Sequence, residues 1–134
     1  MAEVFDVGQV VALAADLQGA AASVAARASQ VVTHWGQILE TRVKARASGR
    51  PGPNVITGDY RRSINLELVS EGNAFGAVVG TVAVQGRRLE YGFVGVDSLG
   101  RHYDQPPFPH HLPALDETEP DFTAAVADLG VGPL

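Results

Sequence analysis

The sequence predicts an α+β fold in which a long N-terminal helix and a C-terminal helix pack on a small, mainly antiparallel β-sheet. Apolar residues recur at steps of three and four through the Ala-rich first third of the chain. They alternate with polar residues in the middle third and return to helical spacing near the C-terminus. With 134 residues, 46% of them apolar and 19% charged, the composition is typical of a single globular domain spanning residues 1–134.

The first helix is predicted over residues 7–47, which contain no proline. Gly36 within it could mark a bend or a close contact with another element. Its end is basic from residue 42 to residue 50, which complements the negative end of a helix dipole. Contact with DNA or an acidic partner is the alternative interpretation of these cations. One stripe of bulky apolar residues defines the helix: Val10, Leu13, Leu17, Val24, Val31, Trp35 and Ile38.

The next segment changes the chain from helix to sheet. Residues 48–55 hold two prolines and two glycines, which predict a flexible loop. Thr57 then can cap a short helical turn. This turn should deliver Ile64 to the core and carry two adjacent cations outward, Arg61 and Arg62.

Two strands are predicted to follow as an antiparallel pair. Leu66 and Leu68 alternate with polar neighbours, as in a half-buried strand. Residues 71–73 form a turn into a second strand over residues 75–84. Within that strand two glycines predict a bulge or a close backbone approach, Gly76 and Gly80.

The last part of the chain returns to helix. Residues 85–93 predict a short turn or helical piece, and residues 94–103 predict a third strand or a hairpin arm. The closing helix is predicted over residues 110–129, broken or restarted at Pro120. Residues 130–134 should form a tail.

Charge and cysteine content exclude several classes of function. The formal net charge is −5 and the isoelectric point about 5.2, which argues against nucleic-acid binding by the chain as a whole. The absence of cysteine excludes disulfides, thiolate nucleophiles and Cys-ligated zinc. No signal peptide is readable at the start, and the longest apolar runs are too short to span a membrane.

No constellation of side chains predicts catalysis, cofactor binding or metal binding. His110 and His111 are adjacent and, with His102, lack the spacing of a metal site. Ser63 lies in no nucleophile elbow, and the Gly-Lys-Ser/Thr of a phosphate loop is missing. We therefore expect no catalytic residue, no cofactor and no metal ligand.

A second expectation concerns contacts with other proteins. The arginine pairs could be solvated charge, could contact DNA in a channel, or could form salt bridges between subunits with acidic residues near the C-terminus: Asp116, Glu117, Glu119 and Asp121. The residues expected at an oligomer or partner interface are Arg61, Arg62, Arg87, Arg88, Tyr91, Phe108 and Trp35.

Three ordered motifs resemble those of a known family. The stretch from Thr57 to Ile64 is similar to a Thr-Gly-x-Leu-Arg-x-Ser motif, with Tyr60 in place of the aliphatic residue. The second is Leu89-Glu90-Tyr91-Gly92, where the family has an aliphatic-Glu-aromatic-Gly motif. The third is Pro106-Pro107-Phe108 followed by Leu112-Pro113-Ala114-Leu115, where the family has a Pro-Phe-x-x-Pro-Ala-Leu ending. Over residues 10–128 the chain resembles the head–tail joining proteins of long-tailed double-stranded DNA phages, the neck, tail-completion or minor tail protein type.

The resemblance implies a structural, non-enzymatic virion protein that is assembled in the host cytoplasm. Its subunits would form a homo-oligomeric ring, a hexamer that matches the tail tube. The ring would join the head connector or stopper to the tail terminator or tail tube and let genomic DNA pass without sequence-specific binding. A tail terminator that caps the tube is one alternative, and a small nucleic-acid-binding accessory protein or enzyme is another.

Overall fold

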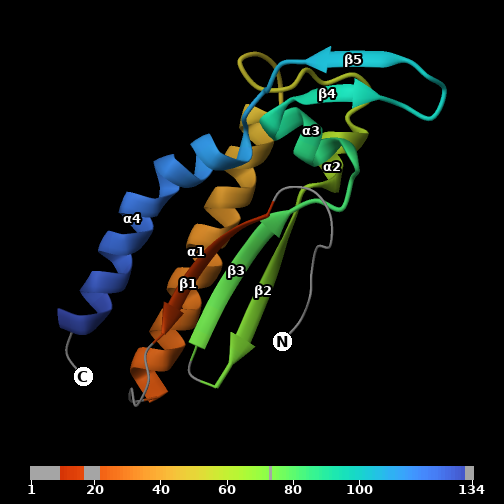
Figure 1. Ribbon diagram of the computed structural model, residues 1–134. Coiled ribbons are helices and arrows are strands. Elements are labelled where there is room, and N and C mark those ends of the chain that lie inside the picture. The colour runs from red at the N-terminus through yellow and green to blue at the C-terminus, as the bar shows by residue number, and fades with distance from the viewer. Residues whose placement is uncertain (1–9, 17–21, 73, 132–134) are drawn as a thin grey trace.

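The computed structural model describes residues 10–16, 22–72 and 74–131. They form helices packed on antiparallel strands, as in an α+β fold (Figure 1). The predicted fold class is therefore confirmed. In chain order the elements are β1 (Val10–Asp16), α1 (Ala22–Arg46), α2 (Asp59–Ser63), β2 (Asn65–Glu71), β3 (Ala74–Gly80), α3 (Gln85–Tyr91), β4 (Phe93–Val96), β5 (His102–Gln105) and α4 (His111–Val131).

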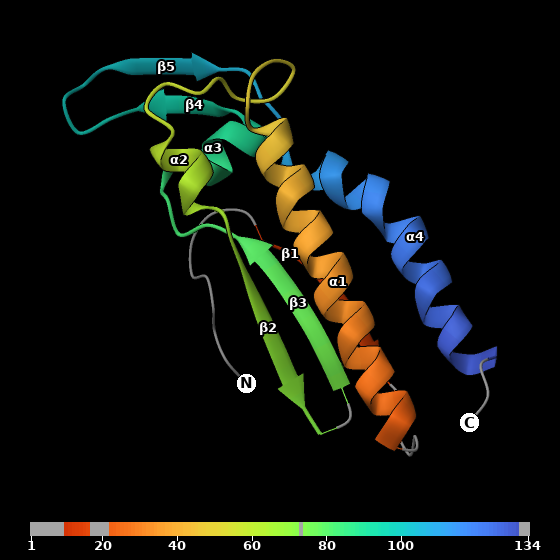
Figure 2. The same ribbon diagram turned by 180° about the vertical axis from the view of Figure 1, so that it is seen from behind.

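Two layers form the main body of the molecule. The three-stranded sheet has the order β1-β3-β2, and both pairings are antiparallel. Helix α1 lies across one face of this sheet, and α4 runs beside α1, as Figure 2 shows from the helical side. One face of the sheet is thereby buried, which is the usual solution for an antiparallel sheet.

The predicted first helix is wrong for its N-terminal part. Residues 10–16 form β1, which pairs along its whole length with β3, and α1 begins only at Ala22. Alanine-rich sequence with apolar steps of three and four fits a helix locally, but pairing with a central strand overrides that weak preference. The other residues of the predicted N-terminal part, 7–9 and 17–21, lie outside the described residues.

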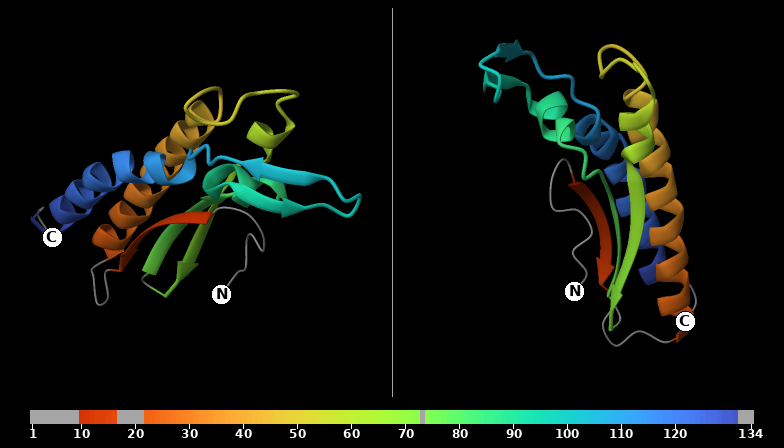
Figure 3. Two further views of the ribbon diagram at one scale, coloured as in Figure 1. Left: turned by 45° about the horizontal axis from the view of Figure 1, so that its top comes forward. Right: turned by 90° about the vertical axis from the view of Figure 1, so that its right-hand side faces the viewer.

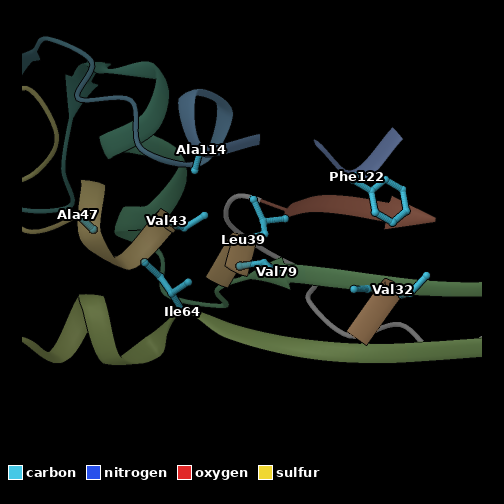
Figure 4. Packing of buried hydrophobic residues seen from close by; sticks show 9 residues of the cluster. Val32, Leu39, Val43, Ala47, Ile64, Val79, Ala114 and Phe122 are labelled. Atoms are coloured by element: carbon cyan, nitrogen blue, oxygen red, sulfur yellow. The ribbon is translucent and has the colours of Figure 1, made fainter. Parts of the chain in front are cut away.

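The core lies between α1, the sheet and α4. Three residues of α1 and Ala47, directly after it, are fully buried or nearly so, and they meet Ile64, two side chains of β3 and two of α4 (Figure 4). Gly36 marks a close contact, as one of its two interpretations predicted, because a Cβ there would lie 2.7 Å from the Cβ of Ala77. The buried cluster comprises Val32, Leu39, Val43, Ala47, Ile64, Ala77, Val79, Ala114 and Phe122.

The second sheet is a hairpin that projects from the end of the body near the last turn of α1 (Figure 3). Strands β4 and β5 pair from Phe93 with Gln105 to Val96 with His102. The Asp97 carboxyl group organises the loop, since it accepts the backbone N–H groups of Leu99 and Arg101, both at 2.9 Å. These hydrogen bonds lower the pKa of Asp97. The predicted hairpin arm is confirmed.

Two further predictions are corrected. Pro120 does not break the closing helix, because α4 continues through it to Val131. Pro120 has no backbone N–H to donate to the carbonyl of Asp116, and both residues are exposed. The pairing of β3 runs without interruption through Gly76, so there is no bulge there, and the strand ends at Gly80.

Candidate functional site

A buried glutamate joins two helices that are distant in the sequence. Glu90 lies in α3, is only 1% exposed, and faces the first turn of α4. Its Oε1 atom accepts the backbone N–H groups of His110 and His111, both at 2.9 Å, and Oε2 accepts that of Leu112 at 3.1 Å. These N–H groups have no partner inside the helix, and a carboxyl group there also complements the helix dipole. Glu90 therefore caps α4 from another element.

His110 connects this cap to α2. Its Nδ1 atom donates to the carbonyl of Phe108 at 2.9 Å, which leaves Nε2 as the acceptor of the neutral ring. The hydroxyl group of Tyr60, in α2, lies 2.5 Å from Nε2 and donates to it. The backbone N–H of Phe108 in turn donates to the carbonyl of Leu89 in α3 at 2.6 Å. Helices α2, α3 and α4 are thus linked by one hydrogen-bonded set.

His111 is buried without a hydrogen-bond partner for either ring nitrogen in the described part of the chain. Its ring packs against that of His110 with 4.5 Å between the ring centroids. Burial, and then the neighbouring His110, lower the pKa of His111 to about 3. We call Tyr60, Glu90, Phe108, His110 and His111 together the buried junction.

Burial also shifts the pKa values of His110 and Tyr60. It lowers the pKa of His110, although the Phe108 carbonyl and Glu90 oppose that shift. Burial raises the pKa of Tyr60, and the charge of Glu90 acts in the same direction. At neutral pH both histidines and the tyrosine are therefore uncharged. Such a set holds backbone elements in place, and no exposed nucleophile or base projects from it.

An open groove of about 780 Å³ lies beside the buried junction. Tyr60 and Phe108 belong to both, because they also line the groove. Its rim carries Arg50 and Arg61, and the Arg50 guanidinium lies 3.7 Å from the centroid of the Phe108 ring. The remaining apolar lining comes from the loop after α1, from α3 and from the segment after β5: Ala47, Pro53, Val55, Ile56, Leu89 and Pro106.

The groove exposes apolar surface that a small soluble domain would normally cover. Ile56 is 92% exposed, which is the highest value among the large apolar side chains in the described residues. The hairpin above adds Val94 at 79% and Leu99 at 74%. Apolar surface gathered at one end of a molecule is typical of a protein interaction site.

The predicted interface residues other than Trp35 lie near the groove or on α3. Arg61 lines the groove and donates to the Ser48 hydroxyl at 2.9 Å, whereas Arg62 pairs with Asp59. Among the α3 residues, Arg87 and Tyr91 are exposed. Arg88 is exposed too and lies 3.9 Å from the centroid of the Phe93 ring.

Trp35 belongs to a different region. It is half-buried against the core, and its ring meets that of His34 edge to face at 5.2 Å. The structure thus brings Arg61 and Phe108 together at the groove but places Trp35 in the packing of α1. Its role in an interface stays a prediction.

The first predicted motif folds largely as expected. The Thr57 hydroxyl accepts the backbone N–H of Asp59 at 3.2 Å, but the residue that precedes α2 is Gly58, one position later than predicted. Gly58 has φ of +85°, a conformation that side chains disfavour, and a Cβ there would lie 2.8 Å from the Arg62 side chain. Ile64 is fully buried, as predicted.

The basic end of α1 has a use that the sequence did not indicate. Arg42 and Arg46 pair with Glu117 of α4 at 3.4 and 2.7 Å, and Arg42 also donates to the Thr118 hydroxyl at 3.0 Å. Hydrogen bonding to Arg46 lowers the pKa of Glu117. Glu117 is thus engaged within the subunit. Gly52 and Pro53 in the 48–55 loop are buried. The predicted flexibility of this loop stays a prediction.

Sequence reasoning missed Glu90, Tyr60 and His110 as a unit. Two signals were present: a glutamate within the motif at residues 89–92, and two histidines at the start of a helix that has no acidic residue in its first turn. A helix start without its own capping side chain calls for a partner from elsewhere in the chain.

Among the described residues, no group of three or more potential ligands could hold a metal ion, and no helix is long and apolar enough to cross a membrane. His102 lies exposed on β5, apart from the buried pair His110 and His111. A scan of family models and searches of characterised proteins and solved structures found no match to this chain.

Proposed function

We propose that the chain is a structural virion protein of a tailed phage and forms a ring at the head–tail interface. The ring would join the head connector to the tail and let DNA pass. Its partners would be further copies of the chain, the connector or stopper protein, and the tail terminator or tail tube proteins. It would assemble in the host cytoplasm and act in the particle without a cofactor.

The observation that carries the proposal is the meeting of the three family-like motifs at the buried junction. The first motif contributes Tyr60, at the position where the family has an aliphatic residue. The second contributes Glu90, and the third contributes Phe108, two residues before His110. Motifs that are separated in the sequence but meet in one hydrogen-bonded unit hold the same part of the fold together. The closeness of the three motif segments in this chain supports the proposal, and the hydrogen bond from Tyr60 to His110 is a feature of this chain at the position where it departs from the motif.

The surface around the junction supports an assembling protein. Three motif residues, Tyr60, Leu89 and Phe108, line an open apolar groove, and exposed apolar side chains continue onto the hairpin. A domain of this size has little core to spare, so apolar surface of this kind is stabilised when subunits cover it. The net charge of −5 is compatible with a lumen that does not retain DNA phosphates.

Two measurements test the proposal. We expect the purified full-length protein to form closed rings in negative-stain images, and purified particles to contain a few copies of it. Cryo-electron microscopy of the particle should show its density between the head connector and the tail tube. Density at the last ring of the tube itself would instead identify a tail terminator. A protein that stays monomeric and is missing from particles would overturn the proposal.

A further inference from the structure

Two cations near the groove and two anions on α4 have no ion-pair partner within the described residues. On the groove side, Arg50 and Arg61 contact no carboxyl group within the described residues. On α4, Asp116 and Glu119 are exposed and have no cation partner within the same residues. Glu117 between them is already held by α1. These two cations and these two anions thus lie on separate surfaces, whereas other exposed carboxyl groups lie elsewhere, such as Glu71 on β2 and Asp104 on β5.

Apolar character is matched in the same way. The exposed residues of α4 that point away from α1 include Asp116 and Glu119, and we call this set the outer face of α4. Its other members are Leu112, Pro120, Thr123, Ala124 and Ala127. The groove lining is partly apolar and includes Arg50 and Arg61, and its one carboxylate, Asp59, is paired with Arg62. A helix face with a central strip of small residues and carboxyl groups beside it is complementary to such a groove in both shape and charge.

The two surfaces lie on opposite flanks of the subunit. In Figures 1 and 2, α4 forms one flank of the molecule, whereas α2 lies across α1 on the other flank. Two different surfaces on opposite flanks cannot both join the same pair of copies. They join each copy to a different neighbour, which is a heterologous contact and closes into a ring when the rotation allows.

We propose that the groove binds the outer face of α4 from a second copy of this chain, with Arg50 and Arg61 facing Asp116 and Glu119 of the neighbour. This inference rests on the proposed function and identifies the subunit contact of that ring. Ile56 would be covered by the neighbouring helix. Because the paired charges are at the rim, the contact should weaken as the salt concentration rises.

A charge exchange between two variants tests the contact. Variant one carries Asp116→Arg and Glu119→Arg, and variant two carries Arg50→Glu and Arg61→Glu. Each alone brings like charges together at every contact, so we expect its dissociation constant in sedimentation velocity to rise about tenfold or more. An equal mixture restores opposite charges at both kinds of contact, so it should assemble into alternating rings.

A matched control and a second measurement complete the design. Glu67→Arg with Glu71→Arg makes the same change in net charge as variant one, but on β2, away from both surfaces, and should assemble like the unmodified chain. Since the chain has no cysteine, Arg61→Cys with Glu119→Cys gives one defined crosslink between copies. Under oxidation in assembled particles we expect a ladder of covalent oligomers.

The outcomes separate this inference from the proposed function. If the unmodified chain forms rings but the two variants associate equally well alone, the contact is wrong and the ring stands. If the chain is present in particles but the cysteine variant gives no ladder, the contact is likewise overturned. If the chain forms no oligomer and is missing from particles, both the ring and the contact are wrong.

Discussion

The buried junction and the groove share a wall, yet the same residues behave differently on its two sides. On the inner side, the Tyr60 hydroxyl and the Phe108 carbonyl both bond to His110, which is fully buried. On the outer side, the same two residues line an open groove with Ile56 almost fully exposed. Substitutions on the inner side should therefore change stability, whereas those on the outer side should change association.

The largest effect should come from removing the cap of α4. Glu90→Ala leaves three backbone N–H groups without their acceptor, and each buried donor left unpaired costs about 1–3 kcal/mol. We expect the free energy of unfolding in urea to fall by about 3 kcal/mol or more. The control is Glu117→Ala, which removes a half-exposed ion pair on α4 and should cost less than about 1 kcal/mol. Equal losses in the two variants would contradict the role assigned to Glu90.

Acid should weaken the junction next. Folding lowers the pKa of His111 from 6.5 to about 3, and burial lowers that of His110 as well. When folding lowers the pKa of a basic group, the native state favours the neutral form of that group. The resulting stabilisation is complete above pH 6.5 and is lost as the pH falls toward 3. His111 should cost up to about 1.4 kcal/mol per pH unit within that range.

The window and a variant make this dependence specific. The carboxyl groups with lowered pKa, Glu117 and Asp97, have ordinary values of 4.5 and 3.8, so they lose stabilisation only at lower pH. Between about pH 6.5 and pH 4.5 the slope of unfolding free energy therefore reports the histidines. His111→Leu should reduce that slope by an amount that corresponds to up to one proton taken up on unfolding. An unchanged slope in the variant would show that His111 does not contribute.

A contrast between local patterns and contacts of distant residues explains which features the sequence could predict. Helical spacing in α1 and α4, the loop at 48–55 and the hairpin depend on local patterns, and these were found. Strand β1 was missed because its partner, β3, lies about sixty residues away in the chain, and pairing with that strand overrode the local helical pattern. The Glu90 cap was missed for a related reason, since its recipients are about twenty residues later and in another element.

The candidate site divides along similar lines. Arg61 and Phe108 were predicted as interface residues from their types and positions, and both line the groove. Glu117 was grouped with the free carboxyl groups of α4, but only the packing of α4 on α1 places it within reach of Arg42 and Arg46. Sequence identifies which charges exist. The choice between a bond within the subunit and a free surface charge depends on how the helices pack.

The smallest effect on stability, and the sharpest test of the outer side, should come from Ile56→Ser. Ile56 is 92% exposed, so the free energy of unfolding should change by no more than about 0.5 kcal/mol. Covering this side chain in a contact between copies would contribute about 1.5–3 kcal/mol, so its loss should weaken association roughly tenfold or more. Leu99→Ser is the matched control, because Leu99 is 74% exposed at the hairpin tip and does not line the groove. It should leave both quantities unchanged. If Leu99→Ser weakened association and Ile56→Ser did not, the hairpin tip and not the groove would be the surface that subunits share.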